Sequence, residues 1–151
     1  MRFKLAAVTL LATAPFPLGG AVFAQQGQQV DPATLYEVTA PESGQKVKVG
    51  SKGKVFLFLK TKNDSHVSTE APFKIEVTGK GLKPDKDRLA LSDAVEKRPV
   101  PEGVADPRFE IPFLATSAGR GAVEAKLTFF ICTEKICARQ QKTLAVPVLV
   151  E

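Results

Sequence analysis

The segment Ala122-Val123-Glu124-Ala125-Lys126-Leu127-Thr128-Phe129-Phe130-Ile131 predicts more about the architecture of this chain than any other. Apolar and polar side chains alternate along most of it, which is the pattern of a β-strand with one buried face. The side chains expected to point into the core are Val123, Ala125, Leu127, Phe129 and Ile131. A second strand is expected at residues 139–150, so that the two strands form one long hairpin.

Short runs of β-branched and aromatic residues, separated by Gly, Pro, Asn and Asp, occur along the rest of the chain. Such runs predict further strands, which we expect at residues 36–40, 45–49, 54–60, 73–78 and 108–116. Strands do not alternate with long helical segments, which disfavours a thioredoxin-type fold. Together with the length of the chain, the pattern predicts an all-β, immunoglobulin-like β-sandwich of about seven to nine short antiparallel strands.

The segments between these strands are expected to be irregular. Residues 62–65 have the composition of a turn, and residues 79–81 are expected to end the strand before them. Residues 82–107 contain four prolines and many charges. We expect a long loop there, with a short strand or one helical turn at residues 89–95.

Residues 1–24 have the features of a secretory signal peptide. Arg2 and Lys4 precede an apolar run, and Val22-Phe23-Ala24 offers small residues at the positions that signal peptidase reads. We therefore expect cleavage after Ala24, a polar and disordered lead-in at residues 25–33, and the domain at residues 34–151. An uncleaved anchor is the alternative. Both interpretations place the domain in the periplasm or otherwise outside the cytoplasmic membrane, where disulfides persist.

The composition disfavours several classes of function. Without Arg2 and Lys4 the chain has 19 basic and 16 acidic residues and no basic run interleaved with aromatics, so nucleic-acid binding is not expected. His66 is the only histidine and is interpreted as a solvated turn residue, which leaves a blue-copper site without its ligands. Cys132, Cys137 and His66 would only just complete a zinc site. We expect no metal, no other cofactor and no small-molecule substrate.

Cys132 and Cys137 are the only cysteines, and they flank a short tip between the last two predicted strands. If residues 133–136 form the loop, Cys132 lies opposite Cys137, and the same register sets Ala125 against Leu144. Residues opposed in this way lie about 4.5 to 5.5 Å apart at Cα, so a disulfide is feasible. Strand parity places both cysteines on the solvent side.

The parity also has a weak point, because Gln140 and Lys142 fall on the inward side of the last strand. A bulge or a sheet edge near the tip would account for them.

The residues alone leave two interpretations of the cysteine pair open. A disulfide that closes so short a loop stabilises by only roughly 2 kcal/mol, which is the contribution of a modest structural staple. A pair at an exposed tip is instead accessible to a partner thiolate and can exchange. Lys135 and Arg139 favour a thiolate there, and Glu134 opposes them.

Several segments in the last third of the chain share their pattern with one known family. They are Glu110-Ile111-Pro112-Phe113, Ala118-Gly119, Leu127-Thr128-Phe129-Phe130-Ile131-Cys132, Cys137 and Lys142-Thr143-Leu144-Ala145-Val146-Pro147-Val148. These segments resemble the N-terminal periplasmic domain of the DsbD thiol:disulfide interchange proteins. That family domain has an immunoglobulin-like fold with two redox cysteines on a hairpin. Its members shield the cysteines with an aromatic-bearing cap loop, whereas residues 92–107 contain no aromatic residue here.

The resemblance implies a function and a role for each cysteine. The domain would pass electrons to or from periplasmic thiol or thioredoxin-like proteins, or a separate membrane reductase, with Cys137 as the attacking sulfur and Cys132 as the resolving one. The alternative is a non-enzymatic envelope domain, for interaction or assembly, in which the disulfide only staples the hairpin. The sequence does not predict the oligomeric state.

Overall fold

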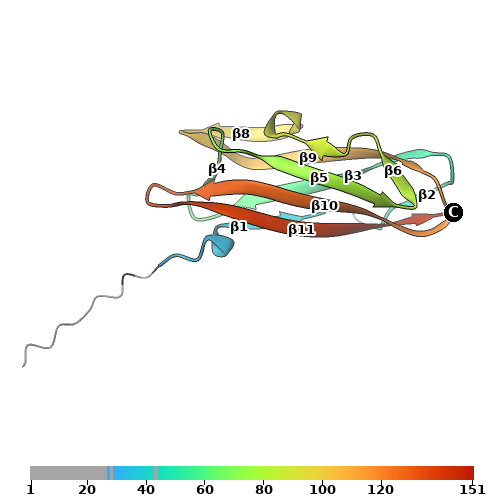
Figure 1. Cartoon of the computed structure of the whole chain (residues 1–151), viewed down its shortest axis with the longest axis horizontal. Helices are drawn as coiled ribbons and strands as arrows, with labels where there is room; N and C mark the ends of the chain where they lie inside the picture. The colour runs from blue at the N-terminus through green and yellow to red at the C-terminus, as the bar shows by residue number, and fades with distance from the viewer. Residues whose placement is uncertain (1–26, 28, 43) are drawn as a thin grey trace, which may run out of the picture.

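Strands occupy most of the chain that the computed structural model describes, which is residues 27, 29–42 and 44–151 (Figure 1). The predicted signal peptide, residues 1–24, lies outside these described residues. The strands are β1 (Tyr36–Thr39), β2 (Lys46–Val47), β3 (Lys52–Thr61), β4 (His66–Ser68), β5 (Lys74–Lys80), β6 (Leu82–Pro84), β7 (Arg88–Leu89), β8 (Glu96–Val100), β9 (Gly103–Ala115), β10 (Gly119–Cys132) and β11 (Cys137–Val150).

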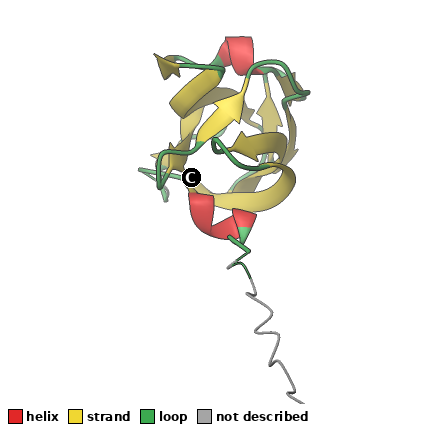
Figure 2. Ribbon diagram, turned by 90° about the vertical axis from the view of Figure 1, so that its left-hand side faces the viewer, coloured by secondary structure: helices red, strands yellow, loops and turns green. Residues whose placement is uncertain are grey.

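The strands form one sheet that curls into two layers (Figures 1 and 2). Its path runs β1-β3-β9-β4-β10-β11-β2, with β5 paired to β10 and with β6 and β8 paired to β9. All pairs are antiparallel except β2 with β11. The predicted all-β, immunoglobulin-like class is confirmed. The described residues form eleven strands, and β9, β10 and β11 are 13 to 14 residues long rather than short.

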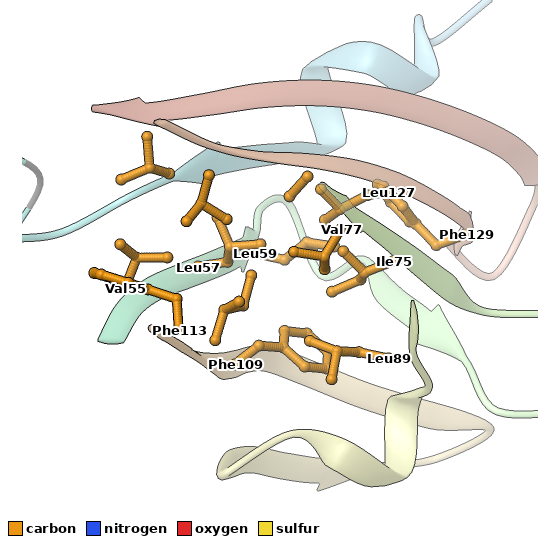
Figure 3. Close-up of a cluster of buried hydrophobic side chains, with 14 of the residues drawn as sticks. Val55, Leu57, Leu59, Ile75, Val77, Leu89, Phe109, Phe113, Leu127 and Phe129 are labelled. Atoms are coloured by element: carbon orange, nitrogen blue, oxygen red, sulfur yellow. The ribbon is translucent and has the colours of Figure 1, made fainter. Parts of the chain in front are cut away.

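The core lies between the two layers, and its composition follows from the alternation in β10. Val123, Ala125, Leu127, Phe129 and Ile131 are all fully buried, as the sequence predicts. Figure 3 shows Leu127 and Phe129 on one side of the core and Leu57 and Phe109 on the other. Burying one such side chain contributes about 1.5 to 3 kcal/mol, so the alternation fixes which face of β10 points inward.

The prediction of a long loop at residues 82–107 is wrong. This region contains β6, β7, a 3-10 helix η2 (Leu91–Asp93), β8 and the start of β9. Leu82 and Leu89 are buried there and hold the short strands against the core. Pro84 and Pro99 lie in strands that pair only with β9, and an edge strand tolerates a residue without an N–H. Of the short strand or helical turn expected at residues 89–95, the helical turn is present as η2, and β7 reaches into the range only at Leu89.

Two smaller points concern element ends. β5 ends at Lys80, within the residues 79–81 that were expected to end it. A 3-10 helix η1 spans Pro32–Leu35, so regular structure begins two residues inside the predicted lead-in of residues 25–33. Within the described residues, no helix has the length and apolar character needed to cross a membrane.

Candidate functional site

The β10–β11 hairpin carries both cysteines and is paired without interruption from base to tip. Its register runs from Gly119 opposite Val150 to Cys132 opposite Cys137, and it includes the predicted pair Ala125 and Leu144. At the tip, the Thr133 N–H donates to the Ile136 carbonyl over 2.8 Å. The predicted register and the loop at residues 133–136 are therefore both confirmed.

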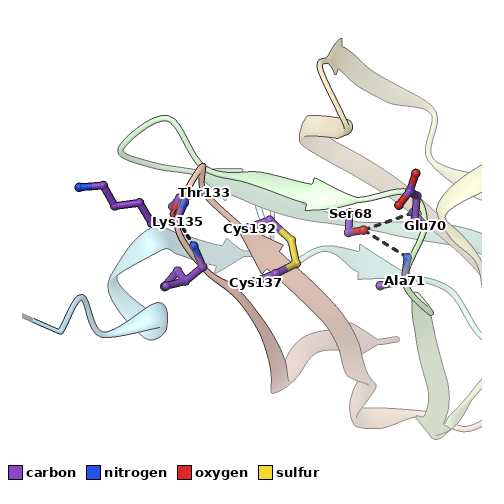
Figure 4. Close-up of a disulfide and its surroundings, with 8 residues drawn as sticks. Ser68, Glu70, Ala71, Cys132, Thr133, Lys135 and Cys137 are labelled. Carbon is purple, nitrogen blue, oxygen red and sulfur yellow. Dashed lines mark hydrogen bonds between the residues drawn. A yellow bond between two sulfur atoms is a disulfide. The ribbon is translucent and has the colours of Figure 1, made fainter.

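Cys132 and Cys137 form a disulfide at the end of this hairpin (Figure 4). Their Cα atoms are 4.0 Å apart, somewhat closer than expected. Because Thr133 and Ile136 are the hydrogen-bonded pair, the cysteines occupy the adjacent non-hydrogen-bonded position, where opposed side chains approach most closely. The Thr133 hydroxyl oxygen also accepts from the N–H groups of Lys135 and Ile136, each over 3.2 Å, and so orders the turn.

The two cysteines differ in exposure, which the strand parity did not predict. Cys137 is exposed, whereas Cys132 is only 6% exposed. The cause is β4, which pairs with the free edge of β10 and sets Val67 against Ile131 and His66 against Cys132. The expectation that both cysteines lie on the solvent side is therefore wrong for Cys132. A partner thiol can approach this disulfide from the side of Cys137.

The sheet topology explains why the polar residues Gln140 and Lys142 can occupy the inward side of β11. β2 pairs only with Leu149 and Val150, so the middle of β11 is a sheet edge among the described residues, and the hairpin has no bulge. Gln140 is half-buried, and its Oε1 accepts a hydrogen bond from the Tyr36 hydroxyl over 3.2 Å. Burial, together with the charge of Asp31, raises the pKa of Tyr36. Of the two expected explanations, the edge is confirmed.

Three tips meet at the disulfide end of the molecule, which is on the left in Figure 1: the turn joining β3 to β4, and the tips of the β8–β9 and β10–β11 hairpins. Between them lies a hollow of about 350 Å³, whose lining includes both cysteines, His66, Glu102 and the tip. An adjoining hollow of about 630 Å³ shares His66, Glu102 and Glu134 with it. The cysteine pair is thus set at the edge of a concave, polar surface.

The β3–β4 turn places His66 at this surface, which corrects its interpretation as a solvated turn residue. Asn63 and Asp64 both have positive φ, 54° and 55°, and the Ser65 N–H donates to the Lys62 carbonyl over 3.1 Å. This is a tight turn of type I′, with a left-handed backbone at both central residues. β4 begins directly after it, with His66 as its first residue. The Asn63-Asp64 pair between two extended segments is the sequence signal that could have indicated this.

The β8–β9 turn contributes Glu102, which no sequence motif indicates. Glu102 has a φ of 65°, a conformation that favours glycine and is strained for other residues. The neighbouring Gly103 lies against β4, because a Cβ built on it would be 2.6 Å from the Cδ2 of His66. Glycine at this position lets the histidine ring and the β8–β9 turn pack closely.

Asp106 joins the β8–β9 hairpin to the end of β3. Its carboxylate accepts from the Thr61 N–H over 2.9 Å, from the Thr61 hydroxyl over 3.1 Å and from the Arg98 guanidinium over 3.2 Å. Partial burial acts to raise the pKa of Asp106, but the hydrogen bonds from Thr61 and Arg98 outweigh it and lower this pKa below its ordinary value. The carboxylate is therefore held in its charged form and anchors two of the three tips.

Cys132, Cys137 and His66 are also the residues that a zinc site would have to use. The structure brings His66 beside the cysteines, but the two sulfurs are bonded to each other. In the part of the chain described here, no group of three or more His, Cys, Asp or Glu is arranged to hold a metal ion. The arrangement offers a disulfide, an imidazole and several carboxylates rather than a ligand set.

Known proteins that are similar to this chain are similar only at a low level. No protein-family model matches it, and no curated protein matches it significantly. Among solved structures, domains 4 and 5 of the S-layer protein SbsC are 16% identical with a TM-score of 0.34, over 76% of this chain and 51% of that one. The chain therefore spans about half of that S-layer fragment.

Two further structures are similar over most of their own length. AggA, the major subunit of aggregative adherence fimbriae type I from Escherichia coli, is 13% identical with a TM-score of 0.36, over 77% of this chain and 94% of that one. A PapD-like domain of human CEP192 is 12% identical with a TM-score of 0.30, over 96% of each chain. Likenesses at this level concern the fold and assign no activity.

Proposed function

We propose that this domain carries out thiol–disulfide exchange through the Cys132–Cys137 pair. The observation that supports this most directly is the unequal exposure of the two residues at the end of the hairpin. Exchange proceeds by attack of a thiolate on one sulfur, and its rate depends on which sulfur can be reached. Cys137 is accessible beside a hollow of about 350 Å³, which gives a partner protein room to approach.

The reaction takes place in two steps. In the direction that reduces the domain, the Cys132–Cys137 disulfide is the starting state. A thiolate of a partner dithiol attacks the Cys137 sulfur, the bond to Cys132 breaks, and Cys132 leaves with the electron pair. The second partner thiolate then attacks the partner's sulfur in this mixed disulfide and releases Cys137 as a thiolate. The partner becomes a disulfide, and the domain gains two electrons and, at neutral pH, up to two protons. The reverse sequence reduces a partner disulfide, with Cys137 attacking and Cys132 resolving.

The roles of the two sulfurs follow the resemblance to the DsbD family, and the greater exposure of Cys137 is compatible with them. The proposed partners are periplasmic thioredoxin-like proteins or a separate membrane reductase, and the sulfurs need no cofactor. The proposed location outside the cytoplasmic membrane is the one in which such a disulfide persists.

Single-cysteine variants test this function. The partner in this test is a mutant thioredoxin-like protein that keeps only its attacking cysteine, activated as a mixed disulfide with a small thiol. Cys132→Ser removes the resolving sulfur of the domain. Mixed disulfides between Cys137 and the partner should therefore accumulate. Cys137→Ser is the matched control and should trap much less, because Cys132 is covered. Trapping by neither variant, seen on non-reducing gels of purified proteins, would leave the pair as a structural staple.

A further inference from the structure

His66 is the direct cross-strand neighbour of Cys132. The two residues are opposed in the β4–β10 register and line the same hollow. Opposed residues on antiparallel strands project to the same face with their Cβ atoms roughly 4.5 to 5.5 Å apart, which is within reach of an imidazole and a sulfur. They are 66 residues apart in the sequence, and the short strand β4 brings them together.

The ring of His66 is held in this position by its surroundings. On the other side of β4 it lies over Gly103, where a Cβ would be 2.6 Å from Cδ2. Ser68, two residues further along the same face, is buried, and its hydroxyl oxygen accepts from the N–H groups of Glu70 and Ala71, each over 3.2 Å (Figure 4). β4 is therefore held in place by its close packing on Gly103 and by the hydrogen-bonded turn that begins at Ser68.

We propose that His66 is the acid–base partner of Cys132, stabilising its thiolate when protonated and exchanging a proton with it during disulfide exchange. This inference rests on the proposed function for its purpose, but the interaction itself concerns only these two side chains. In the first step the S–S bond breaks and its electron pair passes to Cys132. A protonated imidazole beside that sulfur either pairs with the thiolate or donates its proton to it. In the reverse direction the neutral imidazole accepts the Cys132 proton before this sulfur attacks Cys137.

The covered sulfur of Cys132 needs such a partner, whereas the exposed sulfur of Cys137 does not. A covered sulfur loses hydration, which makes its thiolate costly unless a positive charge lies nearby. Histidine is suited to this position because it changes charge between about pH 5 and 8.

Other charged groups around the hollow modify this pair and have to be controlled. Glu102 faces it from the β8–β9 turn, Glu134 and Lys135 from the β10–β11 tip, and Glu70 from the segment after β4. The adjoining hollow adds Lys62, Asp64 and Arg98. The carboxylates favour the protonated imidazole, and the cations favour the thiolate directly. Lys135 is the strongest competing source of positive charge, since it lies on the tip itself.

The test is a pH titration of the Cys132 thiolate in the Cys137→Ser protein, followed by ultraviolet absorbance and needing no partner. Replacing His66 with Asn in this background should shift the titration of Cys132 to higher pH, so that the thiolate fraction at neutral pH falls several-fold, up to about tenfold for a shift of one unit. His66→Lys keeps a positive charge and should restore most of the lost thiolate. Lys135→Met should have a smaller effect than His66→Asn.

The matched control is the Cys132→Ser protein, in which Cys137 titrates alone and His66→Asn should change little. Circular dichroism confirms that each variant is folded, and the lysine variant provides a second measurement if the asparagine variant is not. An unchanged Cys132 titration in folded His66→Asn protein would overturn the proposal. Mixed-disulfide trapping is measured separately, so a shifted titration without trapping would reject the exchange function and keep the His66 pairing.

Discussion

The two ends of the β10–β11 hairpin are stabilised by different means. At the base, Val123 and Val146 face each other in register and are buried in the core, and β5 pairs along the other side of β10. At the tip, the inward positions of β11 are Gln140 and the exposed Lys142, and the strands are joined covalently by Cys132 and Cys137. The difference indicates that the fold depends on the packed core face, which on β10 extends as far as Ile131, and that the turn and the disulfide at the tip are free to carry chemistry.

Along this one pair of strands, different residues account for stability and for the proposed function. The hairpin is already paired at all positions up to the cysteines, so the disulfide adds little order that the backbone does not provide. The site residues Cys137, His66 and Glu102 belong to tips at the same end. Changes in the core should therefore act on the free energy of unfolding, and changes at the tips should act mainly on redox behaviour.

The largest expected effect is at the core. Phe129 is fully buried, and its ring packs edge-on against Tyr36 with centroids 4.9 Å apart. Phe129→Ala should destabilise the domain by about 3 to 5 kcal/mol, because it removes a large buried side chain and leaves a cavity. Urea unfolding of the oxidised protein measures this. If Phe129→Ala lowers the free energy of unfolding by less than reduction of the disulfide does, the core is not the main source of stability and the comparison is wrong.

Reducing the disulfide should have a smaller effect on stability. The bond closes a six-residue loop and contributes about 2 kcal/mol at most on the chain-entropy model. The measurement is urea unfolding of the wild-type protein with and without a strong reductant, and the Cys132→Ala/Cys137→Ala double variant is the control for side effects of the reductant. A loss as large as that of Phe129→Ala would instead identify a structural staple.

Much of the architecture could be predicted from sequence because it depends on local alternation. The inward face of residues 122–131 and the hairpin register followed from one pattern, since a single offset paired both the core residues and the cysteines. β6 and β8 were missed because prolines and charges, which are tolerated in edge strands, resemble loop composition. β4 was missed because three residues are too few to show a period.

The composition of the site was harder to predict than the fold. His66 meets Cys132 only because β4 inserts between β9 and β10, and this pairing over a long sequence separation leaves no local signal. The covering of Cys132 has the same cause. Glu102 reaches the hollow through a turn within a region interpreted as a loop. The two cysteines could be identified from sequence, whereas their surroundings required the tertiary structure.

The smallest expected effect on stability concerns the anchor of the tips. Hydrogen bonds lower the pKa of Asp106 in the folded protein, so its stabilising contribution is present above the pKa of the unfolded chain, about 3.9, and is lost as the pH falls through the lower folded value. Asp106→Asn should destabilise by about 1 to 2 kcal/mol at neutral pH, since the side chain is partly exposed.

The pH dependence of the Asp106→Asn effect provides its check. Urea unfolding of wild-type and variant proteins should give a constant difference from pH 7 to about 5, which then shrinks in more acidic solution. A difference that does not depend on pH would show that the charge of Asp106 does not hold the β8–β9 hairpin to β3.

The reduction potential of the Cys132–Cys137 bond tests the central claim most directly. It is measured by equilibrating the purified domain with glutathione or dithiothreitol buffers and quantifying the free thiols. We expect a value above about −300 mV, in the range of thiol–disulfide oxidoreductases, because the bond closes a short loop and is accessible at Cys137. A value clearly below about −300 mV, as in resistant structural disulfides, would contradict a role in electron exchange.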